Sequence, residues 1–458
     1  MRKPLVSAVV LICVAASFYM LGRASVRVPA RDTRAFESER RRVATDPRAE
    51  RPRSEEPAKE SAPRPGPGTD EPAPRDVAEL LEPFLPGRRG EGLLSFASRE
   101  DFEKERARWF PIGAVQLSGA PTGLRLQGAS ALESLPLLRK LERVYFLELR
   151  RCRLTDDVLP GIAHLHAMYE LSLRETGIGD AGLPNLLGMT RLHALDLRRT
   201  RITDEGLRTI AKLTSLVRLN VRDTRITDEG LRHLRTLVQL QELQFQSPGT
   251  TERALDYVME LPALTGLRVD RTELSADALR RIGRMPNLRR LRVENFESGG
   301  LAGLAAASLE ELDLSDARFD PEELAHLARM TSLVSLDLAE SGVNARSLRH
   351  LGGLENLTEL DLHETRLDDE SLGYIKGLDK LESLRLDETG ITDAGVERLA
   401  GLTNLRRLDL DDNDVTDAAV PHLKKLTRLR RLDLSGTRIS ADGIAEIQAA
   451  LPDCAIRR

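Results

Sequence analysis

Leucines recur at a fixed interval along most of this chain. A Leu-x-Leu, Leu-x-Val or Leu-x-Phe triplet occurs thirteen times, and successive triplets begin 24 residues apart except for one step of 21. The triplets begin at Leu147, Leu171, Leu195, Leu219, Leu243, Leu267, Leu291, Leu312, Leu336, Leu360, Leu384, Leu408 and Leu432. Such a period is typical of a solenoid, in which each unit buries its apolar face only against its neighbours.

The segment 192–216 shows what one repeat contains. Leu195 and Leu197 lie two positions apart, so they share one side of a short strand and should point into the core. Asp196 and Arg198 should point the other way, onto an exposed strand face. Each triplet therefore predicts one strand with a buried side and an exposed side.

A short helix is expected after each strand. Thr203 can cap it, because its hydroxyl can accept a backbone N–H of the first turn. Asp204 then places negative charge at the positive end of the helix, and Leu207 and Ile210 fall at helical spacing. The pattern predicts an α/β fold: a curved, horseshoe-shaped solenoid with parallel strands on the concave face and short helices on the convex face.

The repeats resemble a known family. Segments LHALDLRRTRI, LVRLNVRDTRI, LESLRLDETGI and LRRLDLDDNDV match the LxxLxLxxN/C/TxL pattern of leucine-rich repeats. The 24-residue unit with ITDxGL looks most like the ribonuclease-inhibitor-like and F-box-associated subtype. The resemblance covers about 124–458 and implies a protein-binding surface, but no reaction.

Small polar residues occupy the position where the family carries Asn or Cys. These include Cys152, Thr176, Thr200, Thr224, Thr272, Ser341, Thr365, Thr389, Asn413 and Thr437. We expect this ladder to satisfy backbone amides inside the turns.

The N-terminal segment indicates targeting to a membrane. Residues 5–21 carry no charge and follow Arg2 and Lys3, so residues 1–27 are expected to be a signal peptide or an N-terminal membrane anchor. Cleavage after Ala24 would export the chain, whereas an uncleaved segment would anchor it with the repeats outside the cytoplasm. An inverted orientation stays open, because arginines flank both ends of the segment.

Two further regions precede the repeats. Residues 28–75 hold nine of the 23 prolines and many charges of both signs, which predicts a disordered linker. Residues 76–123 are rich in apolar and aromatic residues and are expected to cap the first repeat. The solenoid, 124–458, would then hold about 13–14 repeats and a C-terminal cap. Its first repeat would be a degenerate one at Leu124-Arg125-Leu126, and the run after Pro452 would form a final edge strand.

No motif of an enzyme is present. The chain lacks phosphate loops, nucleophile elbows, HExxH, CxxC pairs and dinucleotide-binding glycines, so we expect no catalysis, no cofactor and no small-molecule substrate. A net charge of −4 also gives no reason to expect nucleic acid as a partner. Cys152 and Cys454 lie at opposite ends of the predicted stack, so both should be free.

His363 is the one histidine that has acidic company. It should project from a strand face with Asp361 and lie near Asp337 and Asp387 of the adjacent strands. A metal site there would need convergent geometry, and a solvated acidic ladder is the favoured interpretation.

Charge is distributed unevenly along the predicted concave face. In the first repeats Arg150, Arg174, Arg198 and Arg222 occupy one column. In the last six repeats Arg385 stands alone among twelve acids at the equivalent exposed positions. Like charges about 4.8 Å apart repel, so they lower stability unless a partner neutralises them. Inheritance from copied repeats, with screening by water, is the alternative explanation.

We therefore expect a non-enzymatic scaffold at the cell envelope that binds a protein ligand on its concave face. The candidate contacts are Arg150, Arg174, Arg198, Arg222, Asp337, Asp361, His363, Asp387, Asp409 and Asp411. A second hypothesis is an F-box-like adaptor, or substrate receptor, in protein turnover, although residues 76–110 do not show a convincing F-box. The irregular repeats at 243–311 have two explanations: their sequence has drifted in a stretch that binds no ligand, or they form a hinge.

Overall fold

The computed structural model describes residues 123–127, 144–151 and 153–458. All of them belong to one unit, Ala73–Arg458. The expectations for residues 1–27 and 28–75, for nearly all of the cap and for Cys152 concern residues that the structure does not describe. Within the described ranges, no helix combines the length and apolar character that a membrane span needs.

One parallel sheet of fifteen strands, in chain order, runs through the whole unit. The strands are β1 (Gly123–Gln127), β2 (Phe146–Arg150), β3 (Glu170–Ser172), β4 (Ala194–Asp196), β5 (Arg218–Asn220), β6 (Glu242–Phe245), β7 (Gly266–Val269), β8 (Arg290–Val293), β9 (Glu311–Asp313), β10 (Ser335–Asp337), β11 (Glu359–Asp361), β12 (Ser383–Arg385), β13 (Arg407–Asp409), β14 (Arg431–Asp433) and β15 (Ala455–Arg457). The predicted α/β solenoid is confirmed, and so are the strand at Leu124–Leu126 and the final edge strand.

The register aligns equivalent residues of successive repeats. Leu195 pairs with Leu219, 24 residues on, and most strand pairs keep this offset. Leu291 pairs with Leu312 across the shortened repeat, and Leu124 pairs with Leu147. Equivalent side chains therefore form continuous columns along the sheet.

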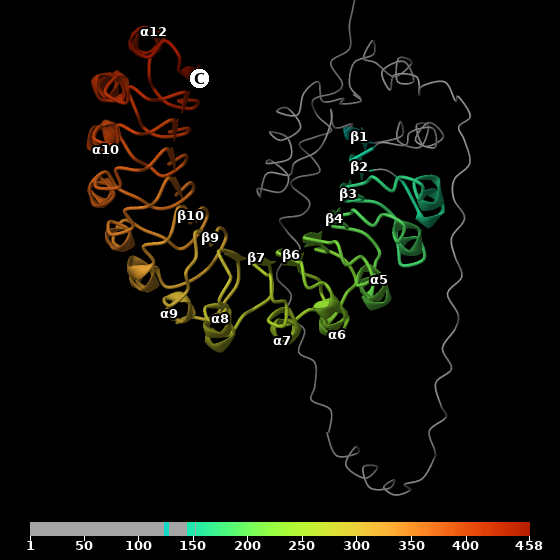
Figure 1. Ribbon diagram of the computed structural model, residues 1–458. Coiled ribbons are helices and arrows are strands. Elements are labelled where there is room, and N and C mark those ends of the chain that lie inside the picture. Colours follow the sequence, from blue (N-terminus) through green and yellow to red (C-terminus); the bar gives the residue numbers. More distant parts are fainter. Residues whose placement is uncertain (1–122, 128–143, 152) are drawn as a thin grey trace, which may run out of the picture. The chain divides into compact units, whose positions relative to one another are not determined.

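Short helices return the chain from one strand to the next. The α-helices are α5 (Asp204–Ile210), α6 (Asp228–Leu231), α7 (Ala254–Val258), α8 (Ala276–Ile282), α9 (Leu301–Leu304), α10 (Asp393–Leu399), α11 (Val420–Leu423) and α12 (Ala441–Ala450). The 3₁₀-helices are η2 (Asp156–Gly161), η3 (Leu183–Leu186), η4 (Arg232–Thr236), η5 (Pro321–Arg329), η6 (Ser347–His350), η7 (Ser371–Tyr374) and η8 (Asp417–Ala419). The strands line the inner side of the curve and the helices the outer side (Figure 1).

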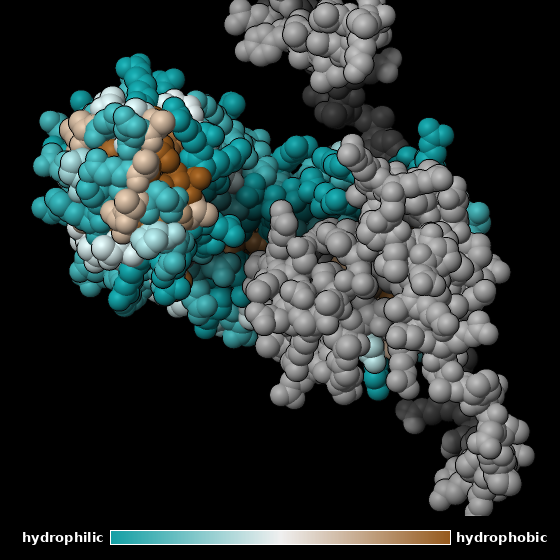
Figure 2. All heavy atoms as spheres, turned by 90° about the horizontal axis from the view of Figure 1, so that it is seen from above, coloured by the Kyte–Doolittle hydropathy of each residue, from teal (hydrophilic) through white to brown (hydrophobic). Residues whose placement is uncertain are grey.

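The core lies between these two layers. Leu195 and Leu197 are both fully buried, as are Leu207 and Ile210 on the facing helix. Seen towards its C-terminal end, the stack shows hydrophobic residues surrounded by hydrophilic ones (Figure 2). Cys454 is buried at this end and is free, as expected.

The polar ladder bonds differently from the expectation. The Thr200 hydroxyl donates to the carbonyl oxygen of Leu197 at 2.7 Å, and Thr176 and Thr389 donate in the same way. These threonines therefore satisfy carbonyl groups, whereas we had expected them to satisfy amides. Asn413 does accept from two amides, those of Gly390 at 2.9 Å and Ile391 at 3.1 Å.

A second ladder, of aspartates, joins the helix starts. Thr203 caps α5 as predicted. Asp204 contributes a further interaction: its Oδ1 accepts the backbone N–H of Thr227 at 2.8 Å and its Oδ2 accepts the Thr227 hydroxyl at 2.7 Å. The pairs Asp180 with Thr203, Asp369 with Thr392, and Asp393 with Thr416 repeat this bridge.

The same bridge explains the glycine of the ITDxGL motif. A Cβ added to Gly230 would overlap Oδ1 of Asp204 from the preceding repeat, and Gly206 lies in the same way against Asp180. The aspartate of one repeat thus requires a glycine in the next.

Candidate functional site

Ten of the strands are followed, one to three residues on, by a residue of left-handed backbone conformation. These residues are Arg151, Glu175, Arg199, Asp223, Arg271, Asp316, Glu340, Glu364, Glu388 and Asp412, with φ between 50° and 63°. None of these ten residues is glycine, although the conformation costs roughly 1–2 kcal/mol for other residues. We call them the left-handed column; it borders the concave face, and all of its members from Asp316 onward are acidic.

The arginine column of the first repeats is neutralised by the chain itself. Arg150 lies 3.4 Å from Glu148, Arg174 3.1 Å from Glu175 and Arg198 3.1 Å from Asp223. Arg222 forms an ion pair with Asp270. The expected repulsion within this column is therefore offset internally, and no external partner is needed for it.

Asp196 departs from the expectation of an exposed strand face. It lies on that face but is only 6% exposed, and burial raises its pKa to about 6. Its carboxylate accepts the backbone N–H of Arg198 at 2.9 Å. Position between two core leucines therefore does not guarantee contact with solvent.

A buried ion network occupies the irregular middle repeats. Asp270 is fully buried and interacts with three arginines: Arg222, Arg268 at 2.8 Å and Arg292 at 3.4 Å. Arg292 also forms an ion pair with Asp313 of the next strand. Ion pairs thus connect the strands of this stretch from β5 to β9. This is the stretch for which sequence drift and a hinge were the two explanations.

A shallow hollow adjoins this network. Glu242, Arg268, Arg290, Arg292, Asp313 and Asp337 are among its charged lining residues, and its volume is about 250 Å³. Arg290 pairs with Glu242 at 2.9 Å, so most charges in the hollow are internally matched.

The concave face of the last repeats keeps an excess of negative charge. Arg385 lies 2.8 Å from Asp361, 3.4 Å from Asp387 and 3.9 Å from Asp409. Among the described residues, no cationic side chain lies within 4.0 Å of Asp337, Glu364, Glu388, Asp411 or Asp412. We call the concave acids from Asp337 to Asp412 the acidic face.

Proton affinities at the acidic face are consistent with this crowding. Burial raises the pKa of Asp337 to about 6, with a further contribution from the charge of Asp313. The charge of Glu364 raises the pKa of Glu388, and burial followed by neighbouring acids raises those of Asp409 and Asp411. Several carboxylates here therefore lack full compensation.

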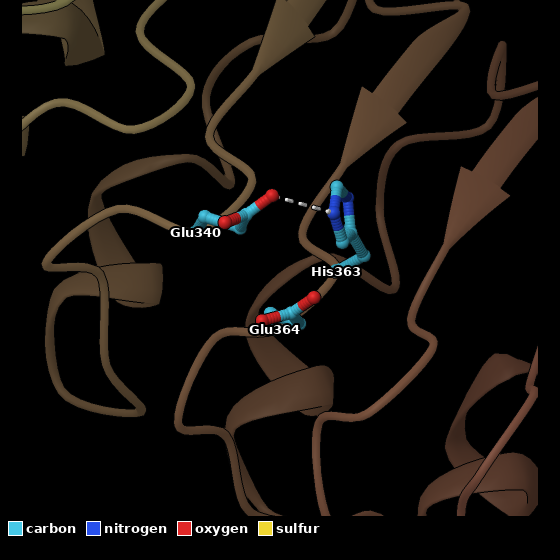
Figure 3. Close-up of side chains that lie close together, drawn as sticks. All are labelled: Glu340, His363 and Glu364. Carbon is cyan, nitrogen blue, oxygen red and sulfur yellow. Dashed lines mark ion pairs between the residues drawn. The ribbon is translucent and has the colours of Figure 1, made fainter. Parts of the chain in front are cut away.

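The structure brings His363 together with Asp361, as expected, and the charge of Asp387 also acts on it. Glu340 and Glu364 lie beside it as well, which was not expected. Glu340, His363 and Glu364 converge at the end of β10 and β11 (Figure 3). Burial lowers the pKa of His363, but the hydrogen bond and charge of Asp361 outweigh it, so the pKa is raised.

Two models of leucine-rich repeats match the chain. A model described as "Leucine-rich repeat region" matches residues 128–372, more than half of the chain, and one described as "Leucine rich repeat" matches 379–439. The protein belongs to the leucine-rich repeat family. Proteins of this family are in general non-enzymatic binding scaffolds. No curated protein sequence matches this leucine-rich repeat chain.

Several solved structures of leucine-rich repeat proteins are similar in fold. An internalin from Listeria monocytogenes is 20% identical, with a TM-score of 0.45, 79% of this chain covered and 95% of the internalin. A leucine-rich repeat protein of Leptospira interrogans is 16% identical, with a TM-score of 0.36, 73% of this chain covered and 100% of that chain. TLR13, in a complex with ssRNA13, is 20% identical, with a TM-score of 0.47, 69% of this chain covered and 53% of TLR13. At these identities the likeness concerns the fold alone.

Three residues of this leucine-rich repeat surface were missed as candidates from the sequence: Glu340, Glu364 and Asp270. Glu340 and Glu364 belong to the left-handed column, and their shared position four residues after the first leucine is the signal that could have placed them together. Asp270 carried no such signal, because its contact with Arg222 spans two strands.

The raised pKa of Asp337 predicts a pH effect on stability. An unfolded aspartate has a pKa of about 3.9, so the folded state binds the proton more tightly and loses stability as pH rises from about 4 through 6. Asp337→Asn keeps the acceptor for the Ala339 N–H, 3.0 Å away. The variant should therefore have a free energy of unfolding about 1 kcal/mol higher at pH 7.5, after allowance for partial exposure, and a higher melting temperature. Near pH 4 its stability should equal that of the unmodified chain.

Thermal melts across pH 4–8 would measure this effect. Asp379→Asn, at an exposed site away from the strands, serves as the control and should shift the curve at neither pH. An Asp337→Asn variant that is less stable at pH 7.5 would contradict the prediction.

Proposed function

We propose that this leucine-rich repeat protein is a non-enzymatic scaffold that binds a basic segment of a protein ligand on its acidic face. The observation that carries the proposal is the set of uncompensated acids on β10 to β13, of which Glu388, Asp411 and Asp412 have no cationic side chain among the described residues within 4.0 Å. Lysines and arginines of a ligand would supply the missing charge. Such complementarity chiefly raises the association rate and fixes the register of the complex.

The proposed contacts extend over both halves of the concave face. In the acidic face they are Asp337, Asp361, His363, Asp387, Asp409 and Asp411. Arg150, Arg174, Arg198 and Arg222 would meet acidic groups of the same ligand. Their internal acid partners, such as Asp223 for Arg198, predict a smaller contribution from that half.

We further propose that the scaffold lies at the cell envelope, as a membrane-anchored or exported protein. The support is residues 5–21, an uncharged run behind Arg2 and Lys3. The F-box-like adaptor remains the second candidate, on the resemblance of ITDxGL units to that subtype. Fractionation of cells expressing the full chain separates the two, because an adaptor in protein turnover would be found in the cytoplasm.

Binding of a basic peptide tests the proposal. We expect the full chain to bind a fluorescein-labelled peptide of alternating Arg and Ser, and not its counterpart with Asp for Arg. Affinity should fall as salt rises, because the Debye length shrinks from about 10 Å at 0.1 M to about 3 Å at 1 M. Changing Glu388→Gln, Asp411→Asn and Asp412→Asn together should weaken binding about tenfold, as the loss of three exposed pairs of about 0.5 kcal/mol each would give.

A matched variant controls for net charge. Glu355→Gln, Glu370→Gln and Glu397→Gln together remove the same number of charges from exposed positions off the strand face. We expect this variant to bind as the unmodified chain does. Equal losses in the two triple variants, or equal binding of the acidic peptide, would overturn the proposal.

A further inference from the structure

Three potential metal ligands from two adjacent repeats converge at the edge of the concave face. Glu340 follows β10, while His363 and Glu364 follow β11. One oxygen of each carboxylate and one ring nitrogen of His363 all lie within 4.8 Å of one another. Figure 3 shows the Glu340 carboxylate and the imidazole facing each other, with Glu364 beside them.

Groups outside this trio fix the orientation and the tautomer of the imidazole. Oδ1 of Asp361 lies 3.0 Å from Nδ1 of His363 and also accepts the backbone N–H of His363 at 3.1 Å. Oδ2 of Asp361 accepts from Arg385 at 2.8 Å, so the carboxylate itself is held. With Nδ1 as the donor, Nε2 is left as the ligand atom, in the arrangement of carboxylate, histidine and metal that recurs in metalloproteins.

The distance from Nε2 to Glu340 fits two ligands of one ion better than a hydrogen bond. Nε2 lies 3.5 Å from Oε1 of Glu340. A good N–H···O hydrogen bond spans about 2.7–3.2 Å. Two ligands each about 2.1 Å from a tetrahedral Zn²⁺ lie roughly 3.4 Å apart. Glu364 has no cationic side chain of the described chain within 4.0 Å, so its charge is available for an ion.

We propose that Glu340, His363 and Glu364 bind one divalent first-row transition ion, with Zn²⁺ as the preferred ion. Nε2 of His363 and one oxygen of each glutamate supply three ligands, and water completes the tetrahedron. Ca²⁺ and Mg²⁺ prefer sites made of oxygen alone, whereas an imidazole nitrogen favours Zn²⁺ and its neighbours in the series. The ion would supply the positive charge that this part of the acidic face lacks. The proposal does not depend on a protein ligand.

Titration of the full chain with ZnCl₂ by isothermal calorimetry tests the site. We expect binding of one Zn²⁺ per chain at His363, and loss of that binding in His363→Asn. His350→Asn is the matched control: its Nε2 also lies 3.5 Å from a carboxylate, that of Glu322, but Arg349 already binds that carboxylate at 2.6 Å. This variant should bind Zn²⁺ as the unmodified chain does.

Two further variants separate ligation from structure. Glu364→Gln changes an exposed ligand and should weaken Zn²⁺ binding at least about tenfold without changing the thermal melt of the ion-free protein. Asp361→Asn, at the orienting group, should weaken it by about 10- to 100-fold. Unchanged Zn²⁺ binding in folded His363→Asn or Glu364→Gln would overturn the proposal, and so would equal affinity for Ca²⁺.

Discussion

Replacing Leu197 by aspartate is expected to lower the free energy of unfolding by at least about 4 kcal/mol, the largest effect that we predict for a single change. Leu197 is fully buried in the stack between Leu173 and Val221, the equivalent leucine or valine of the neighbouring repeats. An aspartate there removes the packed side chain and places a carboxylate where no cation or donor can meet it. Urea or thermal unfolding of the purified chain would measure the loss.

Thr214→Asp provides the control for Leu197→Asp. It introduces the same carboxylate in the same repeat at an exposed turn, so stability should change by less than about 0.5 kcal/mol. Asp196, although a neighbour, would be a poor control because it is itself buried. Comparable losses in the two variants would show that Leu197 does not belong to the core.

Gly230→Ala is expected to destabilise the protein by about 2 kcal/mol, against the usual sign for this change in a helix. A methyl group at Gly230 would overlap the Asp204 carboxylate, which is held in place by its two hydrogen bonds to Thr227. Gly401→Ala has open space around the new methyl group and should be neutral or stabilising by up to about 1 kcal/mol. Thermal melts of the two variants give the comparison.

A double-mutant cycle isolates the cause of the Gly230 effect. Asp204→Ala alone should destabilise the protein, because it leaves the Thr227 N–H and hydroxyl without their acceptor. In that background Gly230→Ala should cost much less than it does in the unmodified chain, since the obstructing carboxylate is gone. Additive losses would mean that the glycine is required for some other reason.

The fold could be predicted from the sequence because its determinants are local and repeated. The spacing of Leu195 and Leu197 defines a strand with one buried side, and the 24-residue period places equivalent leucines in register. Even the atypical end repeats were recognisable, at Leu124–Leu126 and after Pro452, since each keeps the alternation of apolar and polar residues.

Side-chain partners were harder to predict, because they depend on which atoms meet across repeats. The position of the threonine ladder was predicted correctly. Its bonding was not, because the Thr200 hydroxyl donates to a carbonyl oxygen, whereas we had expected it to accept a hydrogen bond from a backbone amide. The neutralising acids Glu175 and Asp223 were visible next to the arginine column, but their contacts follow from the left-handed turn at each of them. The pairing of Arg222 with Asp270 skips one strand and depends on the curvature of the sheet.

The aspartate bridges also bear on how the solenoid comes apart. In an array of repeats, cooperativity is set by the interface between nearest neighbours. Bridges from one repeat to the next run from Asp156, which accepts the Gly179 N–H, to Glu252, which accepts the Ser275 N–H. They resume at Asp369, which accepts the Thr392 N–H. Between them the direction reverses, since Glu323 accepts from the Gly299 amide of the preceding repeat at 2.8 Å. The solenoid therefore consists of two blocks of repeats whose inter-repeat hydrogen bonds run in the same direction. The segment between them is bonded in a different way, and unfolding can stop at this boundary between the two blocks.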